Sequence, residues 1–356
     1  MATEDKAAQR FAPEQLERFV ARVFHAEGLP PDDARIVAQT LVFANLRGVD
    51  THGIMRVPAY LKRLRAGLFN PMPRIDVRRP MPFSATVDGD NAMGPVVARA
   101  CMEACLQTAA DIGIGIATAR RSNHFGAAAA FTVPAAEAGC IAMVMAPGAR
   151  TLAPHGSRAP LFGTNPIAVA VPAGRHPVWS LDMAVSVAAR GHVRLARQAG
   201  RQIPEGWALD EAGAPTTDPD AALRGVMLPI AGPKGSALSM LVDILAGVLS
   251  GAAFAGDTGD WNADFSGPAD VGHFFLVMKV EAFMPLHEFN ARMETSIARL
   301  HALPPATGFE SVHYPGERSA RLQAERSVSG IPVPVPVRDS LAALAQELEL
   351  EFPAPL

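Results

Sequence analysis

The sequence predicts a protein of the mixed α/β class, in which a sheet domain is joined to a helical domain built from both ends of the chain. Strand patterns and helical patterns are mixed between residues 75 and 280, as in α/β and α+β domains. Both ends of the chain follow the helical period. Apolar residues make up 49% of the 356 residues and charged residues only 19%, which excludes a disordered chain.

These patterns divide the chain into three parts. Residues 1–75 form an N-terminal helical segment, residues 76–285 form a mixed α/β domain, and residues 286–356 form a C-terminal helical segment. Because the first and the last segment are both helical, we expect them to pack together as one small domain.

Three helices are predicted in the N-terminal segment, over residues 16–24, residues 36–44 and residues 55–64. Asp32 or Asp33 is expected to cap the second helix. The third follows the run Asp50-Thr51-His52-Gly53. Its regular part is expected to begin near Met55, because Pro58 is tolerated only in the first turn of a helix.

The remaining elements are predicted from apolar runs and from the residues that end them. The predicted strands cover residues 85–87, 112–117, 141–145 and 167–171, and the predicted helices cover residues 95–111, 122–139 and 341–350. Residues 236–255 are apolar enough to resemble a membrane span. Asp243 near the middle would cost about 2.5–3.5 kcal/mol at a bilayer centre, so we expect a buried helix of a soluble protein.

Composition excludes several kinds of partner. The net charge is only −3, so no basic surface indicates nucleic acid. Cys101, Cys105 and Cys140 are too few for a disulfide framework and lack further ligands at zinc spacing, so we expect buried thiols and no metal site. The N-terminal run MATEDKAAQR lacks the apolar core of a signal peptide. We therefore expect a cytoplasmic protein with no nucleic-acid or membrane partner.

The usual nucleotide-binding motifs are missing. The run Ile112-Gly113-Ile114-Gly115-Ile116-Ala117-Thr118 has two glycines but no third glycine at the dinucleotide-binding position, and it continues as a strand. The run Gly232-Pro233-Lys234-Gly235-Ser236 superficially resembles a phosphate loop, but the required order is Gly-Lys-Ser. Neither run predicts a standard phosphate cradle.

The strongest local feature is the spacing of His52, Arg56 and Tyr60. If this segment is helical, the three side chains lie four residues apart on one face and can hold a small hydroxy or keto acid. Arg56 would bind the carboxylate, Tyr60 would add a contact to the substrate, and His52 would exchange a proton with its oxygen. The alternative is a capped helix with an exposed arginine and an interfacial tyrosine, and the local pattern alone favours it.

Two further residues stand out. His124 follows Ser122-Asn123 at a strand-to-helix turn with Gly126 behind it, where free backbone N–H groups can face an anion. A simple N-cap with a partly exposed histidine is the alternative. Asp182 lies between Leu181 and Met183, where an unpaired buried charge would be costly, so it is either a paired structural carboxylate or a functional one.

An ordered series of motifs runs through almost the whole chain: Thr51-His52-Gly53-Ile54 with Arg56, Pro58 and Tyr60, Ser122-Asn123-His124-Phe125-Gly126, Ala153-Pro154-His155-Gly156, Gly163-Thr164-Asn165-Pro166-Ile167, Leu181-Asp182-Met183-Ala184, Gly206-Trp207-Ala208-Leu209-Asp210, Gly232-Pro233-Lys234-Gly235, Gly272-His273-Phe274-Phe275 and Pro315-Gly316-Glu317-Arg318. In this order they resemble the type-2 malate/L-lactate dehydrogenase family. The resemblance implies a non-Rossmann nicotinamide-binding sheet domain, NAD or NADP as cofactor, and a cytoplasmic homodimer.

The resemblance also implies roles for single residues. His52 matches the family's catalytic acid/base, Arg56 its clamp on the substrate carboxylate, and His124 a histidine at the nicotinamide–substrate site that is the proton acceptor in some members. The positions that match cofactor contacts are His124, Phe125, Gly126, Ala127, Ala128, Thr164, Asp182, Met183, Ala184, Lys234 and Arg318. The expected activity is hydride transfer between NAD(P) and C2 of a small 2-hydroxy or 2-keto acid.

Two departures from the family pattern bear on the substrate. Thr51 stands where the family usually has serine, and its hydroxyl can still bond to His52. Members that reduce cyclic imino acids carry an aspartate paired with that serine and histidine, whereas this chain has His192, in Arg190-Gly191-His192-Val193. The sequence therefore favours 2-hydroxy acid chemistry. Reduction of a cyclic imine, and a cofactor-binding protein without turnover, are the alternatives.

Overall fold

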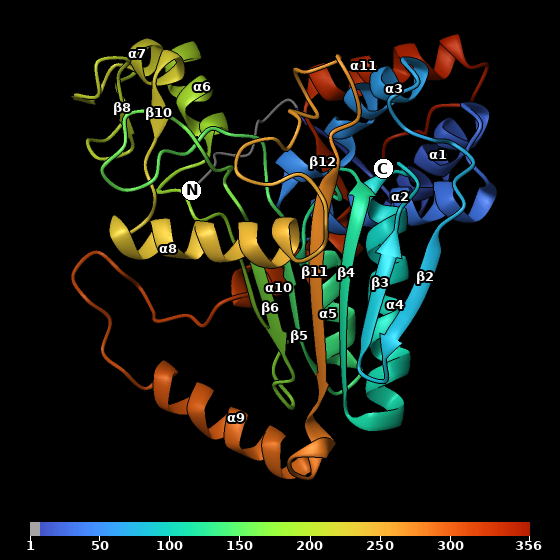
Figure 1. Cartoon of the computed structure of the whole chain (residues 1–356), viewed down its shortest axis with the longest axis vertical. Helices are drawn as coiled ribbons and strands as arrows, with labels where there is room; N and C mark the ends of the chain where they lie inside the picture. The colour runs from blue at the N-terminus through green and yellow to red at the C-terminus, as the bar shows by residue number, and fades with distance from the viewer. Residues whose placement is uncertain (1–7) are drawn as a thin grey trace.

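The computed structural model describes residues 8–356. Residues 1–7, which hold most of the polar run used to argue against a signal peptide, lie outside the described residues. The mixed α/β class is confirmed, because a central sheet of seven strands is covered by helices on both faces (Figure 1). None of the described helices is both long enough and apolar enough to cross a bilayer.

The central sheet has the strand order β2-β3-β4-β11-β5-β6-β7. Only β3 and β4 run parallel, and every other neighbouring pair is antiparallel. A Rossmann fold needs a mostly parallel sheet, so this topology agrees with the missing glycine fingerprint. The strands are β2 (Asp76–Met81), β3 (Ser84–Asp88), β4 (Ile114–Ser122), β11 (Val271–Lys279), β5 (Cys140–Met145), β6 (Ile167–Val171) and β7 (Trp179–Met183).

Helices cover this sheet on both faces. α4 (Gly94–Ile112) and α5 (Ala129–Glu137) pack on one face through a core of alanine, valine, cysteine and phenylalanine side chains. α8 (Pro233–Val242) and the π-helical turn η3 (Asp243–Val248) cover the other face, and α8 crosses in front of the strands in Figure 1. The small side chains allow close approach, as at Gly115, where an added Cβ would lie 2.2 Å from the carbonyl oxygen of Cys105.

Both ends of the chain share a second core. Apolar side chains of the N-terminal helices pack against those of the C-terminal helix α11, and β1 pairs with β12. α10 packs on α2. We call these elements the helical unit: β1 (Gln9–Phe11), α1 (Pro13–Ala26), α2 (Pro31–Leu46), α3 (Val57–Arg65), α10 (Glu317–Ser329), β12 (Ile331–Val333) and α11 (Val335–Glu347).

The C-terminal segment does not lie wholly in the helical unit. α9 (Leu286–His301), which follows the short turn η4 (Val280–Ala282), packs through Ile297 against Ala173 and Tyr314 beside the end of β6. Figure 1 shows α9 at the opposite end of the molecule from α1–α3. The division of the chain at residues 75 and 285 stays a prediction.

A small lobe was not expected from the sequence. It has its own core, which includes Val193 and Ile203, and it lies at the upper left in Figure 1. Its elements are α6 (Arg190–Gln198), β8 (Ala208–Leu209), β9 (Pro215–Thr216), α7 (Pro219–Arg224) and β10 (Val226–Met227). The strands have two residues each, too short for an alternating pattern to be recognised.

Several elements begin or end elsewhere than expected. Neither Asp32 nor Asp33 caps α2, because the N-cap is Pro30 and both aspartates lie inside the first turn. The strand expected from residue 112 begins at Ile114, since α4 runs on to Ile112 and Gly113 ends it in a left-handed conformation with φ 86°. The strand β2 was missed because it lies in a Pro-rich, wholly exposed stretch without alternation.

Three further elements differ from the sequence prediction. The third helix is preceded by two 3-10 turns, η1 (Asp50–His52) and η2 (Ile54–Arg56), with Gly53 extended between them. The helix expected from Ser122 begins only at Ala129, so His124 lies in a loop. The helix expected to be buried within 236–255 exposes several apolar side chains, which are Met240, Leu241, Ile244, Val248 and Leu249.

Candidate active site

A cavity of about 620 Å³ lies where the helical unit, the sheet and the lobe meet. This volume is in the range of cofactor and substrate sites. We call it the central cavity. It brings together ten of the residues singled out by sequence, which are His52, Arg56, His124, Phe125, Gly126, Ala127, Ala128, Thr164, Asp182 and Ala184.

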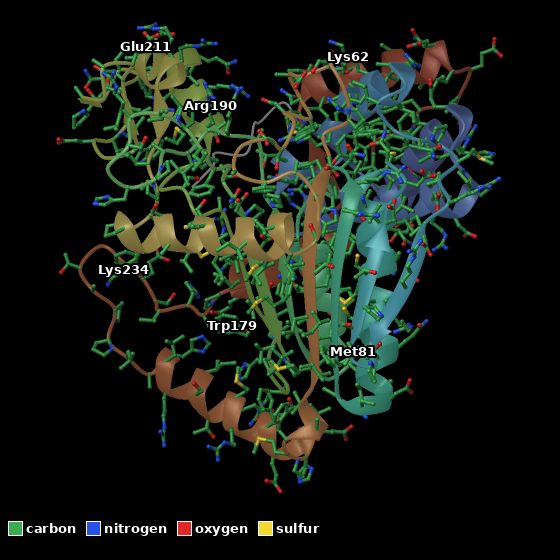
Figure 2. The ribbon with its side chains drawn as sticks, viewed as in Figure 1. Lys62, Met81, Trp179, Arg190, Glu211 and Lys234 are labelled. Carbon is green, nitrogen blue, oxygen red and sulfur yellow. The ribbon has the colours of Figure 1, made fainter. Side chains whose placement is uncertain are left out.

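Five of the expected site residues do not line this cavity. Thr51 and Tyr60 lie behind it and bond to its two histidines. Met183 is half-buried on β7 beside the cavity residues Asp182 and Ala184. Arg318 is exposed on α10, next to the lining residue Ser319, and Lys234 is exposed at the beginning of α8 (Figure 2).

The turn that carries His52 is held by buried polar groups. The side-chain oxygen of Asn45 accepts from the N–H of Ile54 at 2.8 Å, and its nitrogen donates to Asp50 at 2.7 Å. Arg326 of α10 forms an ion pair with Asp50 at 2.8 Å and donates to the carbonyl of Asn45. Gly53 is required here, because an added Cβ would lie 2.1 Å from the Asn45 side chain. The network fixes the direction in which His52 points.

His52 is kept neutral by its surroundings. Burial and, secondly, the charge of Arg56 lower the pKa of His52 to about 4. The hydroxyl of Thr51 lies 3.1 Å from Nδ1 of His52. Two effects therefore keep His52 neutral, which are its enclosure by the protein and the neighbouring cation.

His124 lies in the loop between β4 and α5, and hydrogen bonds and close packing fix the position of this loop. The buried side chain of Asn123 donates to the carbonyl of Ala92 at 2.8 Å and to the side chain of Asn91 at 3.0 Å. At the beginning of α4, Gly94 packs so closely that an added Cβ would lie 2.3 Å from the carbonyl oxygen of His124. The loop is thus fixed in space although it has no regular structure.

Tyr60 sets the orientation of the His124 ring. Its hydroxyl lies 2.6 Å from Nδ1 of His124, and the N–H of Gly126 points at the same nitrogen from 3.4 Å. Two donors toward Nδ1 make that atom an acceptor, which leaves the proton of a neutral ring on Nε2. Burial, followed by the charges of His52, Arg56 and His273, lowers the pKa of His124 well below its usual value.

Trp261 covers the two catalytic candidates His124 and Arg56. Its ring stacks on His124 with centroids 4.4 Å apart, and the guanidinium carbon of Arg56 lies 4.9 Å from its centroid. The loop of Trp261 is anchored by Arg63, which is 1% exposed and donates to three carbonyls, those of Trp261, Asp264 and Gly267. This anchoring positions one wall of the cavity.

The opposite wall is built from small residues and two charges. The alanine- and glycine-rich run 126–129 leads into α5, and Asp182 accepts from the N–H of Ala129 at 2.9 Å. Burial raises the pKa of Asp182 to about 6, although this hydrogen bond and Arg47 oppose the rise. Arg47 also lines the cavity, is 5% exposed, and bonds to Gln323. A buried guanidinium beside small side chains fits the pyrophosphate of a dinucleotide.

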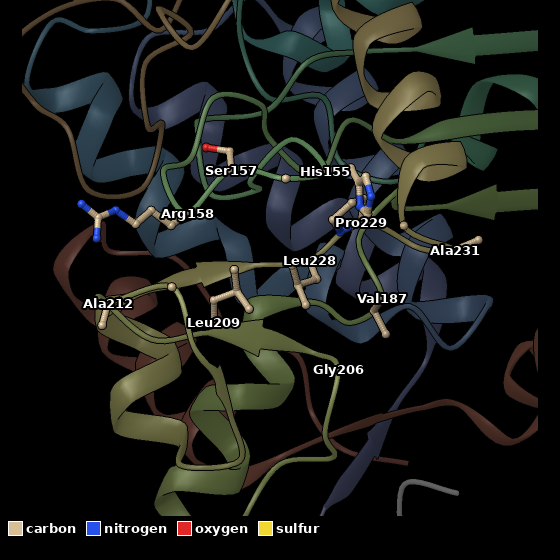
Figure 3. A pocket seen from close by; sticks show the side chains of 13 residues that line it. His155, Ser157, Arg158, Val187, Gly206, Leu209, Ala212, Leu228, Pro229 and Ala231 are labelled. Atoms are coloured by element: carbon tan, nitrogen blue, oxygen red, sulfur yellow. The ribbon is translucent and has the colours of Figure 1, made fainter.

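A second hollow of about 720 Å³ lies between the lobe and the beginning of α8. Figure 3 shows His155 beside Pro229 and Ala231, and Arg158 at the other end. Three of the sequence motifs, 153–156, 206–210 and 232–235, contribute residues to this hollow, so these residues lie apart from the histidines of the central cavity.

Sequence reasoning missed several residues of the central cavity. Trp261 lies in a loop without regular spacing, and Arg47 lies five residues before the His52 motif. Arg190 and Arg194 come from α6, and their i,i+4 spacing was a signal that could have been noticed. His192, which stands at the aspartate position of imine reductases, does not line the cavity and lies near Trp207.

Among residues 8–356, no group of three potential metal ligands is close enough to bind an ion, and the three cysteines are free and buried. The buried, free thiols agree with the expectation from sequence.

Comparisons with known proteins show the family to which the chain is similar. Residues 11–342 match the family model of malate/L-lactate dehydrogenase. The chain is 36% identical over 354 residues to malate dehydrogenase of Pyrococcus horikoshii, covering 96% of each chain. It is 34% identical to L-sulfolactate dehydrogenase of Methanocaldococcus jannaschii, covering 96% of this chain and 97% of that one. The solved structure of the P. horikoshii enzyme superposes with a TM-score of 0.90 over 99% of both chains.

The buried histidine His273 predicts a loss of stability in acid. It is fully buried on β11 with Nε2 2.7 Å from the Ser122 hydroxyl, and burial lowers its pKa to about 3. Below pH 6.5 the unfolded chain takes up a proton that the folded chain does not, so the free energy of unfolding falls as pH falls. Each such histidine contributes up to about 1.4 kcal/mol per pH unit between pH 6.5 and its folded pKa.

The measurement is urea unfolding at several pH values between 7 and 5. We expect His273→Gln, which can still bond to Ser122, to show a smaller slope of stability against pH than the wild type. His287→Gln, at an exposed position of α9, is the matched control and should keep the wild-type slope. An unchanged slope in His273→Gln would contradict the prediction.

Proposed function

The chain belongs to the malate/L-lactate dehydrogenase family and is a dehydrogenase that acts on the CH–OH group of a small 2-hydroxy acid, and on this premise we propose how its residues take part in the reaction. The nicotinamide cofactor, NAD or NADP, supplies the redox step by exchanging hydride with C2 of the acid. The main support for these residue roles is that His52, His124 and Arg56 all line the same cavity.

Arg56 binds the carboxylate of the substrate. Its Nε donates to the carbonyl of Thr51 and its guanidinium lies against Trp261, so the plane of the group is fixed from two sides. The two terminal nitrogens carry no protein partner within residues 8–356. They are therefore available for the paired hydrogen bonds with which a guanidinium binds a carboxylate.

The two histidines have different roles at the oxygen on C2 of the substrate. His124 has its proton on Nε2, because Tyr60 holds Nδ1 as an acceptor, so it donates a hydrogen bond to the oxygen on C2. His52, supported by the Thr51 hydroxyl, takes the hydroxyl proton in oxidation and returns it in reduction. The substrate carboxylate neutralises Arg56 when it binds, which removes one cause of the low pKa of His52 and makes it a better base.

The cofactor contacts are assigned to Phe125 and the mostly small residues that line the cavity beside it. Phe125, the run 126–128, Thr164, Asp182 and Ala184 line the cavity and leave room for a dinucleotide, with Arg47 as a buried cation for its phosphates. Met183, Lys234 and Arg318 remain predicted contacts, since none of them lines this cavity. The preference for NAD or NADP is left open.

The protein is proposed to act as a cytoplasmic homodimer. Exposed apolar side chains follow one side of α8 and η3, with Met240 54%, Val248 52% and Leu249 60% exposed. Such a continuous apolar stripe is typical of a surface covered by another chain. Three free, buried cysteines are compatible with a reducing compartment.

The proposed activity is tested with a panel of acids, following nicotinamide absorbance. We expect NAD- or NADP-dependent oxidation of one or more of malate, sulfolactate, lactate and ureidoglycolate, and reduction of the matching keto acid. Cyclic imino acids should be poor substrates. Turnover of cyclic imines alone, or cofactor binding with no turnover of any acid, would sink the proposal.

A substitution of His52 tests its role in proton transfer. His52→Ala should lower turnover by roughly 10²–10⁴-fold, because it removes the general base, and should leave the affinity for the cofactor nearly unchanged. Steady-state kinetics and cofactor titration measure both effects. His287→Ala, at an exposed site on α9, is the control. Wild-type turnover in the His52 variant would remove this residue from the mechanism.

The proposed dimer predicts a mass near twice 37.5 kDa in sedimentation equilibrium. Val248→Glu places a charge in the apolar stripe and should shift the mass toward that of one chain without loss of helical signal. Val328→Glu, at an 88% exposed position on α10, should have no effect. A monomeric wild type, or a Val248→Glu variant that stays dimeric, would argue against this interface.

A further inference from the structure

Three arginines meet at the histidine end of the central cavity. Arg56 comes from η2, and Arg190 and Arg194 come from α6 of the lobe. Their charges act on one another: the pKa of Arg56 is lowered first by burial and also by Arg194, and that of Arg190 first by burial and then by Arg194. Segments more than 130 residues apart in sequence thus place like charges together.

The cavity does not supply enough negative charge to balance them. Its only carboxylates among the described residues are Asp182 and Asp260. Asp182 lies near Arg47, and Asp260, which accepts from backbone N–H groups of its own loop, partly offsets the lowering of the Arg190 pKa. One carboxylate therefore faces three arginines. Within residues 8–356 none of the three arginines is in an ion pair with a carboxylate, whereas Arg197 on the same helix pairs with Asp220.

The two arginines of α6 are placed at a cost to the helix. Arg190 and Arg194 are four residues apart, so they share one face of α6, and like charges at this spacing destabilise a helix. Arg190 donates a hydrogen bond to the carbonyl of Leu223. Arg194 is exposed, lines the cavity and has no hydrogen-bond partner among the described residues. An anion bound between the two arginines would relieve the repulsion between their charges.

One carboxylate is satisfied by one guanidinium in a paired contact, and Arg56 supplies it. We propose that Arg190 and Arg194 form a subsite for a second anionic group of the substrate, so that the enzyme prefers 2-hydroxy acids bearing a further carboxylate or sulfonate. This inference rests on the proposed function of the same cavity. The phosphates of the cofactor have a separate cation, because Arg47 lies with Asp182 at the other wall.

The test compares substrates that differ in the second charge. In Arg194→Gln we expect kcat/KM for malate, a dicarboxylate, to fall about tenfold or more, because a charged hydrogen bond is lost. Lactate, which has one carboxylate, should change less than about threefold by the same reasoning. Sulfolactate in place of malate distinguishes a sulfonate from a carboxylate as the preferred group. Arg197→Gln, which removes the paired arginine one turn away, is the matched control and should change neither ratio.

A binding measurement separates this inference from the proposed function. Succinate, a dianion without the reacting hydroxyl, should raise the melting temperature of the wild type and raise it less in Arg194→Gln, whether or not any acid is turned over. Equal losses for malate and lactate would overturn the subsite. A loss confined to the KM of NADP would overturn it too, since it would assign Arg194 to a cofactor phosphate.

Discussion

The ion pair between Arg326 and Asp50 is the interaction on which the arrangement of the site depends. It joins the C-terminal helix α10 to the turn that carries His52, and Asn45 completes it from α2. Arg326 is 7% exposed, so removal of Asp50 would leave a buried guanidinium without its carboxylate partner. The packing of both chain ends into one helical unit is therefore a condition for placing His52, and the site uses residues from nearly the whole length of the chain.

The second requirement is a rigid setting for His124, which lies in a loop. Tyr60, Asn123 and the close contact at Gly94 hold this loop from three sides, and Trp261 closes it from the cavity. Tyr60 and the loop anchor Arg63 lie on the same short helix α3, which directly follows the turn of His52 and Arg56. Residues 50–63 thus provide or position most of the groups that would contact the substrate. Because these groups lie close together in the sequence, a local motif was the strongest signal for the site.

Sequence reasoning reached the fold class and this motif, and it failed where position depends on distant segments. His52, Arg56 and His124 could be found because their spacing and neighbours form ordered motifs, whereas Trp261 and Arg194 enter the cavity only through the packing of a loop and of the lobe. The helical face considered for His52, Arg56 and Tyr60 does not form, because Gly53 is extended between two 3-10 turns and regular helix begins only at Val57. Tyr60 is buried with its hydroxyl 2.6 Å from Nδ1 of His124, so in the proposed site it would act on the substrate through that ring.

Substrate binding and proton transfer are coupled in this cavity by simple electrostatics. Burial is the main cause of the low pKa of His52 and of His124, and the charge of Arg56 adds to it in both cases, so both rings are neutral before the substrate arrives. An arriving carboxylate cancels part of that positive field and raises the basicity of His52 at the moment when a base is needed. Enclosure by Trp261 and the lobe strengthens this effect, because charges interact more strongly where water is excluded. In the proposed reaction Arg56 therefore has two roles, because it binds the substrate carboxylate and also influences the basicity of His52.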